Sequence, residues 1–175
     1  MVNYFELYEM PVSFHPDQQR VRQRFYELSR QFHPDRYAQQ GGDALEEALK
    51  MSAWNNAAYK TLKDEDALMS YVLQYNSVLE TEEKYSLPGD FLMDMMELNE
   101  AVSEAEMEGD EGSRKLAADS CGEQMEQLQQ ALETWTRKYD EGNRDAKVLA
   151  VIKDYYFRKK YLLRIQERIA KFATP

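Results

Sequence analysis

The side chains best suited to chemistry in this chain are its two histidines and its single cysteine. His15 and His33 each precede a proline and an aspartate, so the tripeptide His-Pro-Asp occurs twice. Neither histidine has a second ligand at metal-site spacing, and one cysteine cannot build a Cys-rich zinc site. Cys121 falls on an apolar helical stripe with no paired base, which favours core packing over nucleophilic attack. Because no Gly-rich phosphate loop is present either, the sequence predicts no enzyme, no metal and no cofactor.

The composition predicts an all-α protein. Glycine (7) and proline (5) are scarce, and hydrophobic residues make up 43% of the chain. The net charge of -10 disfavours a nucleic-acid partner, which would require a basic face. No basic and apolar leader opens the chain, and no apolar run approaches the roughly 18 residues of a membrane span. We therefore expect a cytoplasmic protein with no membrane partner.

The segments around the second tripeptide predict an antiparallel helical hairpin. Residues 17–32 carry an apolar stripe, and residues 43–62 carry a second stripe that is rich in small side chains. The polar turn at His33-Pro34-Asp35 joins these two arms. Asp17, which ends the first tripeptide, is placed to cap the first arm, so that copy has a structural explanation. Short flanking helices complete a predicted domain of residues 1–75.

The second half of the chain predicts a three-helix bundle. Helical periodicity disappears over residues 76–89, where we expect a linker. Periodicity returns in three segments that each carry one apolar stripe, at 90–107, 113–139 and 145–172. Gly109 and Gly112 are expected to interrupt the helices between the first two segments. Since three such helices can bury their stripes against one another, residues 90–175 are predicted to form a bundle.

Arginines gather on the first arm of the predicted hairpin. Between residues 20 and 37, five arginines stand against two acidic residues. A solvated face with long side chains covering the edge of the core explains this pattern. A docking site for an acidic protein partner is the alternative. Nucleic acid is a weaker candidate because no aromatic stacking platform accompanies the arginines.

The helix predicted at 90–107 has an unusual outer face. Helical geometry places two methionines and three glutamates opposite its apolar stripe, with a leucine on the flank. Scattered exposed apolar residues are common on proteins. A cluster of them with a charged rim is also typical of a protein-binding surface, to which methionine adapts well. This outer face comprises Leu92, Met93, Met96, Glu97, Glu100 and Glu104.

Three motifs together resemble a J-domain. The chain opens with Tyr4-Phe5-x-Leu7, His33-Pro34-Asp35 follows an Arg-rich helix, and residues 56–62 are similar to the family's segment near the end of its third helix. His15-Pro16-Asp17 lacks these flanks, so the tripeptide alone decides little. The resemblance implies that the second copy contacts a DnaK-type ATPase chaperone. By the same resemblance, the basic helix contributes Arg22, Arg24 and Arg30 to this contact, and Arg36 joins them from just after the turn.

The whole chain resembles the HscB family, the J-type co-chaperones of iron–sulfur cluster biogenesis. That resemblance implies stimulation of an HscA-type chaperone, and it assigns the outer face of 90–107 to an IscU-like scaffold protein. By the same resemblance, an aromatic residue of the last helix is expected to join that face, and Tyr156 is the best match where the family often has Phe. Paired Cys-x-x-Cys motifs of a zinc module are absent, which favours a bacterial-type protein. The alternative is a general J-domain co-chaperone whose bundle binds another client or mediates dimerisation.

Overall fold

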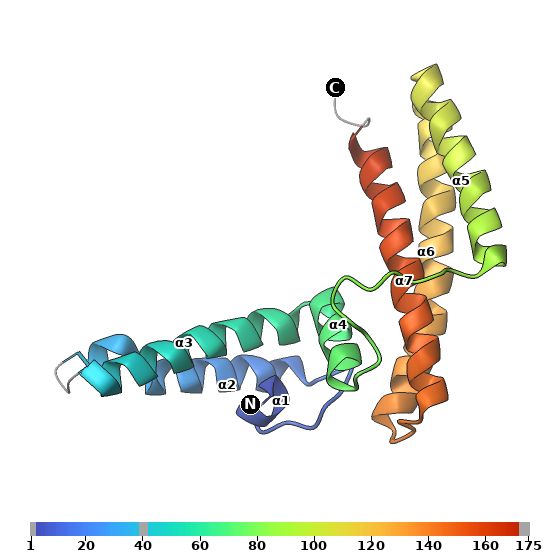
Figure 1. Cartoon of the computed structure of the whole chain (residues 1–175). Helices are drawn as coiled ribbons and strands as arrows, with labels where there is room; N and C mark the ends of the chain where they lie inside the picture. The colour runs from blue at the N-terminus through green and yellow to red at the C-terminus, as the bar shows by residue number, and fades with distance from the viewer. Residues whose placement is uncertain (1–2, 39–41, 172–175) are drawn as a thin grey trace. The chain divides into compact units, whose positions relative to one another are not determined.

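The computed structural model describes residues 3–38 and 42–171. All regular elements in these ranges are helices, which confirms the all-α prediction. The chain divides between Ser77 and Val78 into two compact units, and each is described by itself (Figure 1). The domain limits expected from the sequence, 1–75 and 90–175 with a linker at 76–89, stay a prediction.

The first unit is built around a hairpin of two helices. Its α-helices are α1 (Tyr4–Leu7), α2 (Gln18–Gln31), α3 (Gly42–Lys63) and α4 (Glu65–Tyr75). Figure 1 shows α2 and α3 side by side and running in opposite directions. The stripe of α2 buries Val21 and Leu28, while α3 buries Ala48, Ala58 and Leu62. The small alanine side chains allow the close packing that the sequence predicts.

A buried polar network ties the hairpin to the N-terminal segment. Asn55 of α3 is buried, and its amide nitrogen donates to the Phe25 carbonyl and to Ser29 Oγ, both at 3.0 Å. The Tyr8 hydroxyl donates to Asn55 Oδ1 at 2.9 Å. Burial raises the pKa of Tyr8 well above its ordinary value, so the hydroxyl keeps its proton and remains a donor. Because both polar atoms of the Asn55 side chain are bonded, the network specifies how these segments pair.

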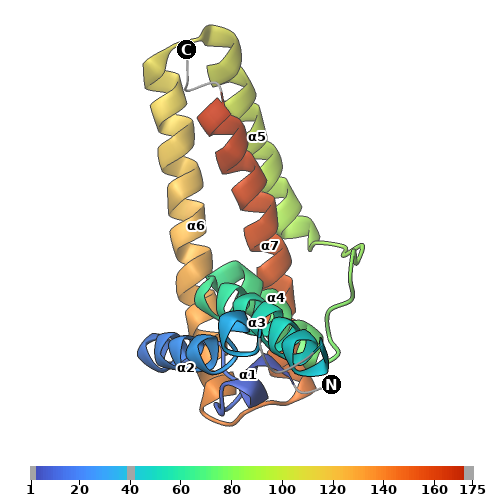
Figure 2. The same ribbon diagram turned by 90° about the vertical axis from the view of Figure 1, so that its left-hand side faces the viewer.

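The second unit is a three-helix bundle. Its helices are α5 (Gly89–Glu108), α6 (Glu111–Asp140) and α7 (Ala146–Lys171). Figures 1 and 2 show α5 and α7 running in the same direction, with α6 antiparallel to both. The three apolar stripes meet in one core, to which α5 contributes Phe91 and Met95, α6 Cys121, and α7 Leu162. Phe172, the last residue of the predicted third helix, lies outside the described residues.

A short cap separates α5 from α6. Gly109 follows α5 with φ 63° and ψ 16°, a left-handed conformation that favours glycine. Asp110 then caps α6, and its carboxylate accepts a hydrogen bond from the Ser113 amide at 2.9 Å. Gly112 therefore lies in the first turn of α6, and the expectation that it interrupts the helices was wrong. The aspartate cap determines where α6 begins.

The stretch before α5 is held on α7. Glu83 pairs with Lys153 at 2.5 Å, and the Tyr85 hydroxyl donates to Asp154 Oδ1 at 2.9 Å. The Tyr85 ring stacks on Phe157 with 4.5 Å between the centroids. Burial and the hydrogen bond to Asp154 raise the pKa of Tyr85 to about 12. These contacts make this stretch a structural part of the second unit.

Candidate functional site

The second His-Pro-Asp copy forms an exposed 3-10 turn, η1 (Pro34–Arg36). Pro34 occupies the first position, where its missing N–H leaves no hydrogen bond unmade. His33 caps the turn because its Nδ1 accepts from the Asp35 amide at 3.4 Å. The Asp35 side chain is 89% exposed, and its carboxylate lies 3.6 Å from His33 Nδ1, the same atom that accepts the amide hydrogen bond and so offers the carboxylate no proton. The turn therefore presents a carboxylate to solvent from a restricted backbone.

Two side chains after the tripeptide tie η1 to the end of α2. Arg36 Nη1 donates to the carbonyl of Arg30 at 2.9 Å, and the Tyr37 hydroxyl donates to the carbonyl of Gln31 at 3.0 Å. Both carbonyls belong to the last turn of α2, where the helix itself supplies no partner. The turn also lies against α3. The position of Asp35 therefore depends on the end of the Arg-rich helix.

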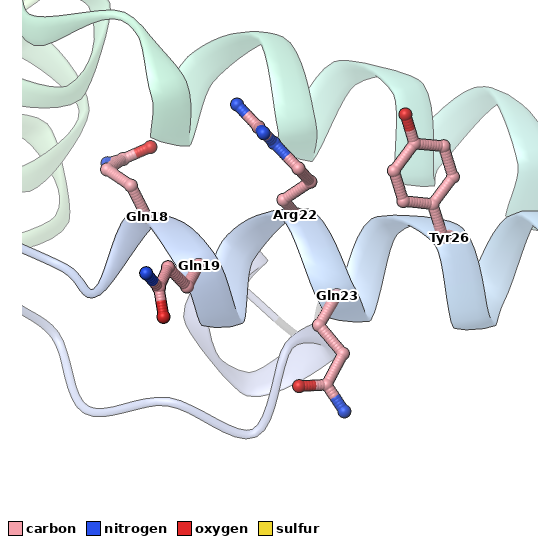
Figure 3. Close-up of a pocket in the computed structure, with 5 residues that line it drawn as sticks. All are labelled: Gln18, Gln19, Arg22, Gln23 and Tyr26. Carbon is pink, nitrogen blue, oxygen red and sulfur yellow. The ribbon is translucent and has the colours of Figure 1, made fainter.

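Three of the four arginines expected at the chaperone surface, Arg22, Arg30 and Arg36, are exposed. Arg22 lies at a surface hollow of 340 Å³ on α2, which is lined by Gln18, Gln19, Arg22, Gln23 and Tyr26. Figure 3 shows Gln18, Arg22 and Tyr26 in a row along one side of the helix. An exposed tyrosine beside an arginine is a combination that protein interfaces favour. The docking role of these residues stays a prediction.

Arg24, the fourth of these arginines, has partners within its own unit. Its guanidinium pairs with Glu9 and with Glu27, each at 2.8 Å. Arg20 donates to the carbonyl of Glu9 at 2.8 Å. Glu9 has a φ of 54°, which is uncommon for a residue with a side chain. Arg20 and Arg24 thus hold this irregular segment against α2, and contact between Arg24 and a chaperone stays a prediction.

The outer face of α5 carries the six residues expected to bind a client. Met93 and Met96 are 67% and 71% exposed, and Leu92 is 38% exposed. The glutamates of this face are exposed as well, and within the described ranges they form no ion pair. They are Glu97, Glu100 and Glu104. The opposite face is buried, as the periodicity predicts, so α5 offers methionines beside unneutralised carboxylates.

Tyr156, the aromatic residue expected to join the client face, lies half-buried on α7. Its ring meets Phe157 edge-on at 5.2 Å, and the Lys160 ammonium lies 5.3 Å from the ring centre. Tyr161 of the same helix reaches α5, because its hydroxyl accepts from Asn99 Nδ2 at 3.3 Å. Its ring also packs against Phe91 at 6.0 Å. Sequence reasoning missed Tyr161 because the apolar stripe of α7 gives no sign of which aromatic faces α5.

The described residues outside these two surfaces offer no cluster suited to metal binding and no exposed thiol. Within residues 3–38 and 42–171, no cluster of three or more His, Cys, Asp or Glu side chains could hold a metal ion. Cys121 is buried in the bundle core, as expected, and burial raises the pKa of its thiol. None of the helices in the described ranges is long and apolar enough to cross a membrane. The notable features are therefore two exposed surfaces, the η1 turn and the outer face of α5.

Comparison with known proteins identifies relatives of both units. Residues 87–170 match the family model of the HSCB C-terminal oligomerisation domain. The Co-chaperone protein HscB homolog of Colwellia psychrerythraea is 33% identical over 135 residues, which cover 76% of this chain and 77% of the relative. The Co-chaperone protein HscB of Proteus mirabilis is 27% identical over 171 residues, covering 96% of this chain and 94% of that protein.

Solved structures share the fold. The crystal structure of human co-chaperone protein HscB matches with a TM-score of 0.76 at 24% identity, covering 99% of this chain and 83% of the human chain. Chaperone HscB from Vibrio cholerae matches with a TM-score of 0.70 at 22% identity, covering 97% and 96% of the two chains. Since both likenesses lie below 25% identity, they concern the fold alone.

Proposed function

This chain belongs to the HscB family of co-chaperones, and on that basis we propose that it delivers an IscU-type iron–sulfur scaffold protein to a DnaK- or HscA-type chaperone in the cytoplasm. In the same proposal it stimulates ATP hydrolysis by that chaperone and so assists the maturation of iron–sulfur proteins. The observation that carries the proposal is the exposed Asp35 carboxylate of the proline-restricted η1 turn. The ATP binds to the chaperone, and this chain supplies contacts only.

Charge and rigidity support the chaperone contact. Exposed arginines of α2 attract an acidic ATPase surface and accelerate encounter. Asp35 is suited to a charge-assisted hydrogen bond with an arginine of the chaperone, because little among the described residues competes for its carboxylate. Pro34 restricts the turn before binding, so less conformational entropy is lost on docking.

The composition of the α5 face supports the client contact. Met93 and Met96 offer flexible, polarisable side chains that lose water on binding. The adjacent carboxylates of Glu97, Glu100 and Glu104 select a partner with basic groups at the rim. Because one chain carries both surfaces, client and chaperone are brought to a raised effective concentration.

Self-association of the bundle is the second candidate function. It is favoured by one observation, that the model matching residues 87–170 is described as an oligomerisation domain. Sedimentation of the purified chain across a concentration range measures it directly. A monomer at every concentration would remove this candidate and leave the first in place.

An ATPase assay tests the first candidate. Chaperone turnover is measured with this chain and the scaffold, added separately and together. We expect stimulation by the chain alone and a larger stimulation with both, because the scaffold is brought to the chaperone. Absence of any stimulation in all three conditions would contradict the proposal.

A methionine double variant then examines the client face. Met93→Ala with Met96→Ala is expected to weaken scaffold binding by about 2 kcal/mol, or roughly 30-fold, because buried methionine area is lost. Stimulation by the chain alone should be retained. Met107→Ala is a matched control, since Met107 lies at the end of the same helix and is 87% exposed. Unchanged scaffold affinity in the double variant would show that the docking face is wrongly placed.

A further inference from the structure

A ridge of basic side chains runs along α7. Helix α7 carries eight lysines and arginines against two acidic residues, whereas α5 carries seven acidic residues and no basic one. Four of the α7 cations recur at spacings of four, four and three, so they share one side of the helix. This basic ridge comprises Lys160, Arg164, Arg168 and Lys171.

The basic ridge adjoins α5. Arg168 Nη2 donates to Ser103 Oγ at 3.0 Å and pairs with Glu106 at 2.6 Å. Closer to the start of both helices, Asn99 and Tyr161 share a hydrogen bond. Figure 2 shows α5 beside the C-terminal half of α7. The client face proposed on α5 therefore continues, across the α5–α7 seam, into a basic strip.

The seam is hollowed at its far end. A surface hollow of 460 Å³ is lined by Glu106, Arg164, Glu167, Arg168 and Lys171. Arg168 is fixed there by its contacts with α5. In the described part of the chain, Arg164 and Lys171 have no hydrogen-bond or ion-pair partner. Two cations thus remain available at a concave edge beside the client face.

The charge segregation has an unfavourable energy in the free chain. Like charges three or four residues apart on a helix destabilise it by about 0.2–0.5 kcal/mol per pair. The basic ridge holds three such neighbouring pairs, and Glu97, Glu100 and Glu104 on α5 hold two. Glu167, which lies three residues after Arg164 and four before Lys171, offsets part of the repulsion on α7. Arg168 and Glu106 form an ion pair between α5 and α7. A partner that brings the opposite charges would relieve the repulsion on both helices.

We propose that the basic ridge is the second half of the client-docking surface and contacts an acidic strip of the same client protein. The inference rests on the proposed function and extends it from α5 to α7. The client then presents basic groups to α5 and acidic groups to α7, with apolar area between them. A second copy of this chain is a poorer occupant, because pairing through these ridges would bury the α5 face that the client requires.

Charge reversal on the ridge tests this inference. The full-length variant Arg164→Glu with Lys171→Glu replaces two side chains that make no polar contact in the described structure, so it is expected to fold normally. Its affinity for the scaffold protein, measured by calorimetry at low salt, is expected to fall about 10-fold. The loss should shrink as salt rises, because rim charges are screened. The control variant Lys115→Glu with Lys147→Glu carries the same charge change at exposed positions away from the ridge and should bind normally.

The outcomes separate the inference from the proposed function. Equal affinity of the ridge variant and the control, with weak binding by Met93→Ala/Met96→Ala, overturns the basic-ridge contact and leaves the α5 face standing. No binding of the scaffold by the unmodified chain overturns both. A dimer in the unmodified chain that becomes a monomer in the ridge variant assigns the ridge to a second copy and also overturns the inference. A selective, salt-dependent loss supports it.

Discussion

The tripeptide His-Pro-Asp occurs twice in this chain, and the two copies have different structural positions. In the first copy, Pro16 is buried and Asp17 caps α2, accepting from the amides of Gln19 and Arg20 at 2.9 and 3.3 Å. In the second copy, the Asp35 carboxylate is largely exposed and receives no backbone hydrogen bond within the described residues. One aspartate is used by the fold, and the other is left available to a partner.

The residues that follow each copy explain the difference. After Asp17 the chain enters a 14-residue helix with free amides at its first turn, and the carboxylate satisfies two of them. At Asp35 only the one-turn η1 helix forms, and His33 Nδ1 accepts a hydrogen bond from the backbone amide of Asp35. The tripeptide therefore does not fix its own conformation. The neighbouring residues determine whether its aspartate caps a helix or stays exposed for binding.

Replacing each aspartate with asparagine should give the largest difference between the two copies. Asp35→Asn is expected to weaken binding to the chaperone by about 3 kcal/mol, roughly 100-fold. The proposed arginine of the chaperone would lose the carboxylate that accepts its hydrogen bond. Asp17→Asn is the matched control, since asparagine caps helices as well as aspartate does. The ATPase assay should show loss of stimulation in the first variant and normal stimulation in the second. Normal stimulation by Asp35→Asn would refute the role assigned to η1.

Removing the Asp17 cap of α2 tests the structural role assigned to the first copy. Asp17→Ala leaves two amides of α2 without their acceptor, so the free energy of unfolding should fall by about 1 kcal/mol. In a unit of this size the midpoint temperature should drop by about 4–8 °C, measured by circular dichroism. Stimulation of the chaperone well below that temperature should be unchanged. A selective loss of stimulation in the folded variant would mean that the first copy also contacts the partner.

Much of the fold follows from apolar periodicity. Phe91, Met95, Leu98 and Val102 are buried as their spacing predicts, and the residues opposite them are exposed. Periodicity succeeds here because each helix buries one stripe, so the local pattern records the tertiary environment. The same reasoning placed the two methionines and three glutamates of the proposed client face outward and Leu92 on the flank, and the family resemblance supplied their proposed role.

Contacts between distant residues were beyond prediction. The hydrogen bond of Tyr8 with Asn55 and that of Tyr85 with Asp154 join positions far apart in the sequence. Such pairs depend on the register in which helices and loops pack, which no local pattern specifies. Arg24 illustrates the consequence for the site: its spacing places it on the flank of the apolar stripe, but its partner Glu9 lies in an irregular segment with no periodicity, so the ion pair between them could not be predicted.

The smallest predicted effect concerns Tyr37, which ties the η1 turn to the end of α2. It tests whether docking of the second copy depends on this tie as well as on the tripeptide itself. Tyr37→Phe removes the hydroxyl that donates to the Gln31 carbonyl and leaves the ring in place. Because water can replace this exposed hydrogen bond, the free energy of unfolding should fall by only about 0.5 kcal/mol. The concentration of this chain that gives half-maximal ATPase stimulation should nevertheless rise about twofold, since η1 is less firmly held and docking loses more entropy. Asp17→Ala, which costs more stability at the other end of α2, should leave that concentration unchanged. If instead the two variants shift it in proportion to their losses of stability, then the exposed aspartate depends on the stability of the unit as a whole and not on the anchoring of its turn.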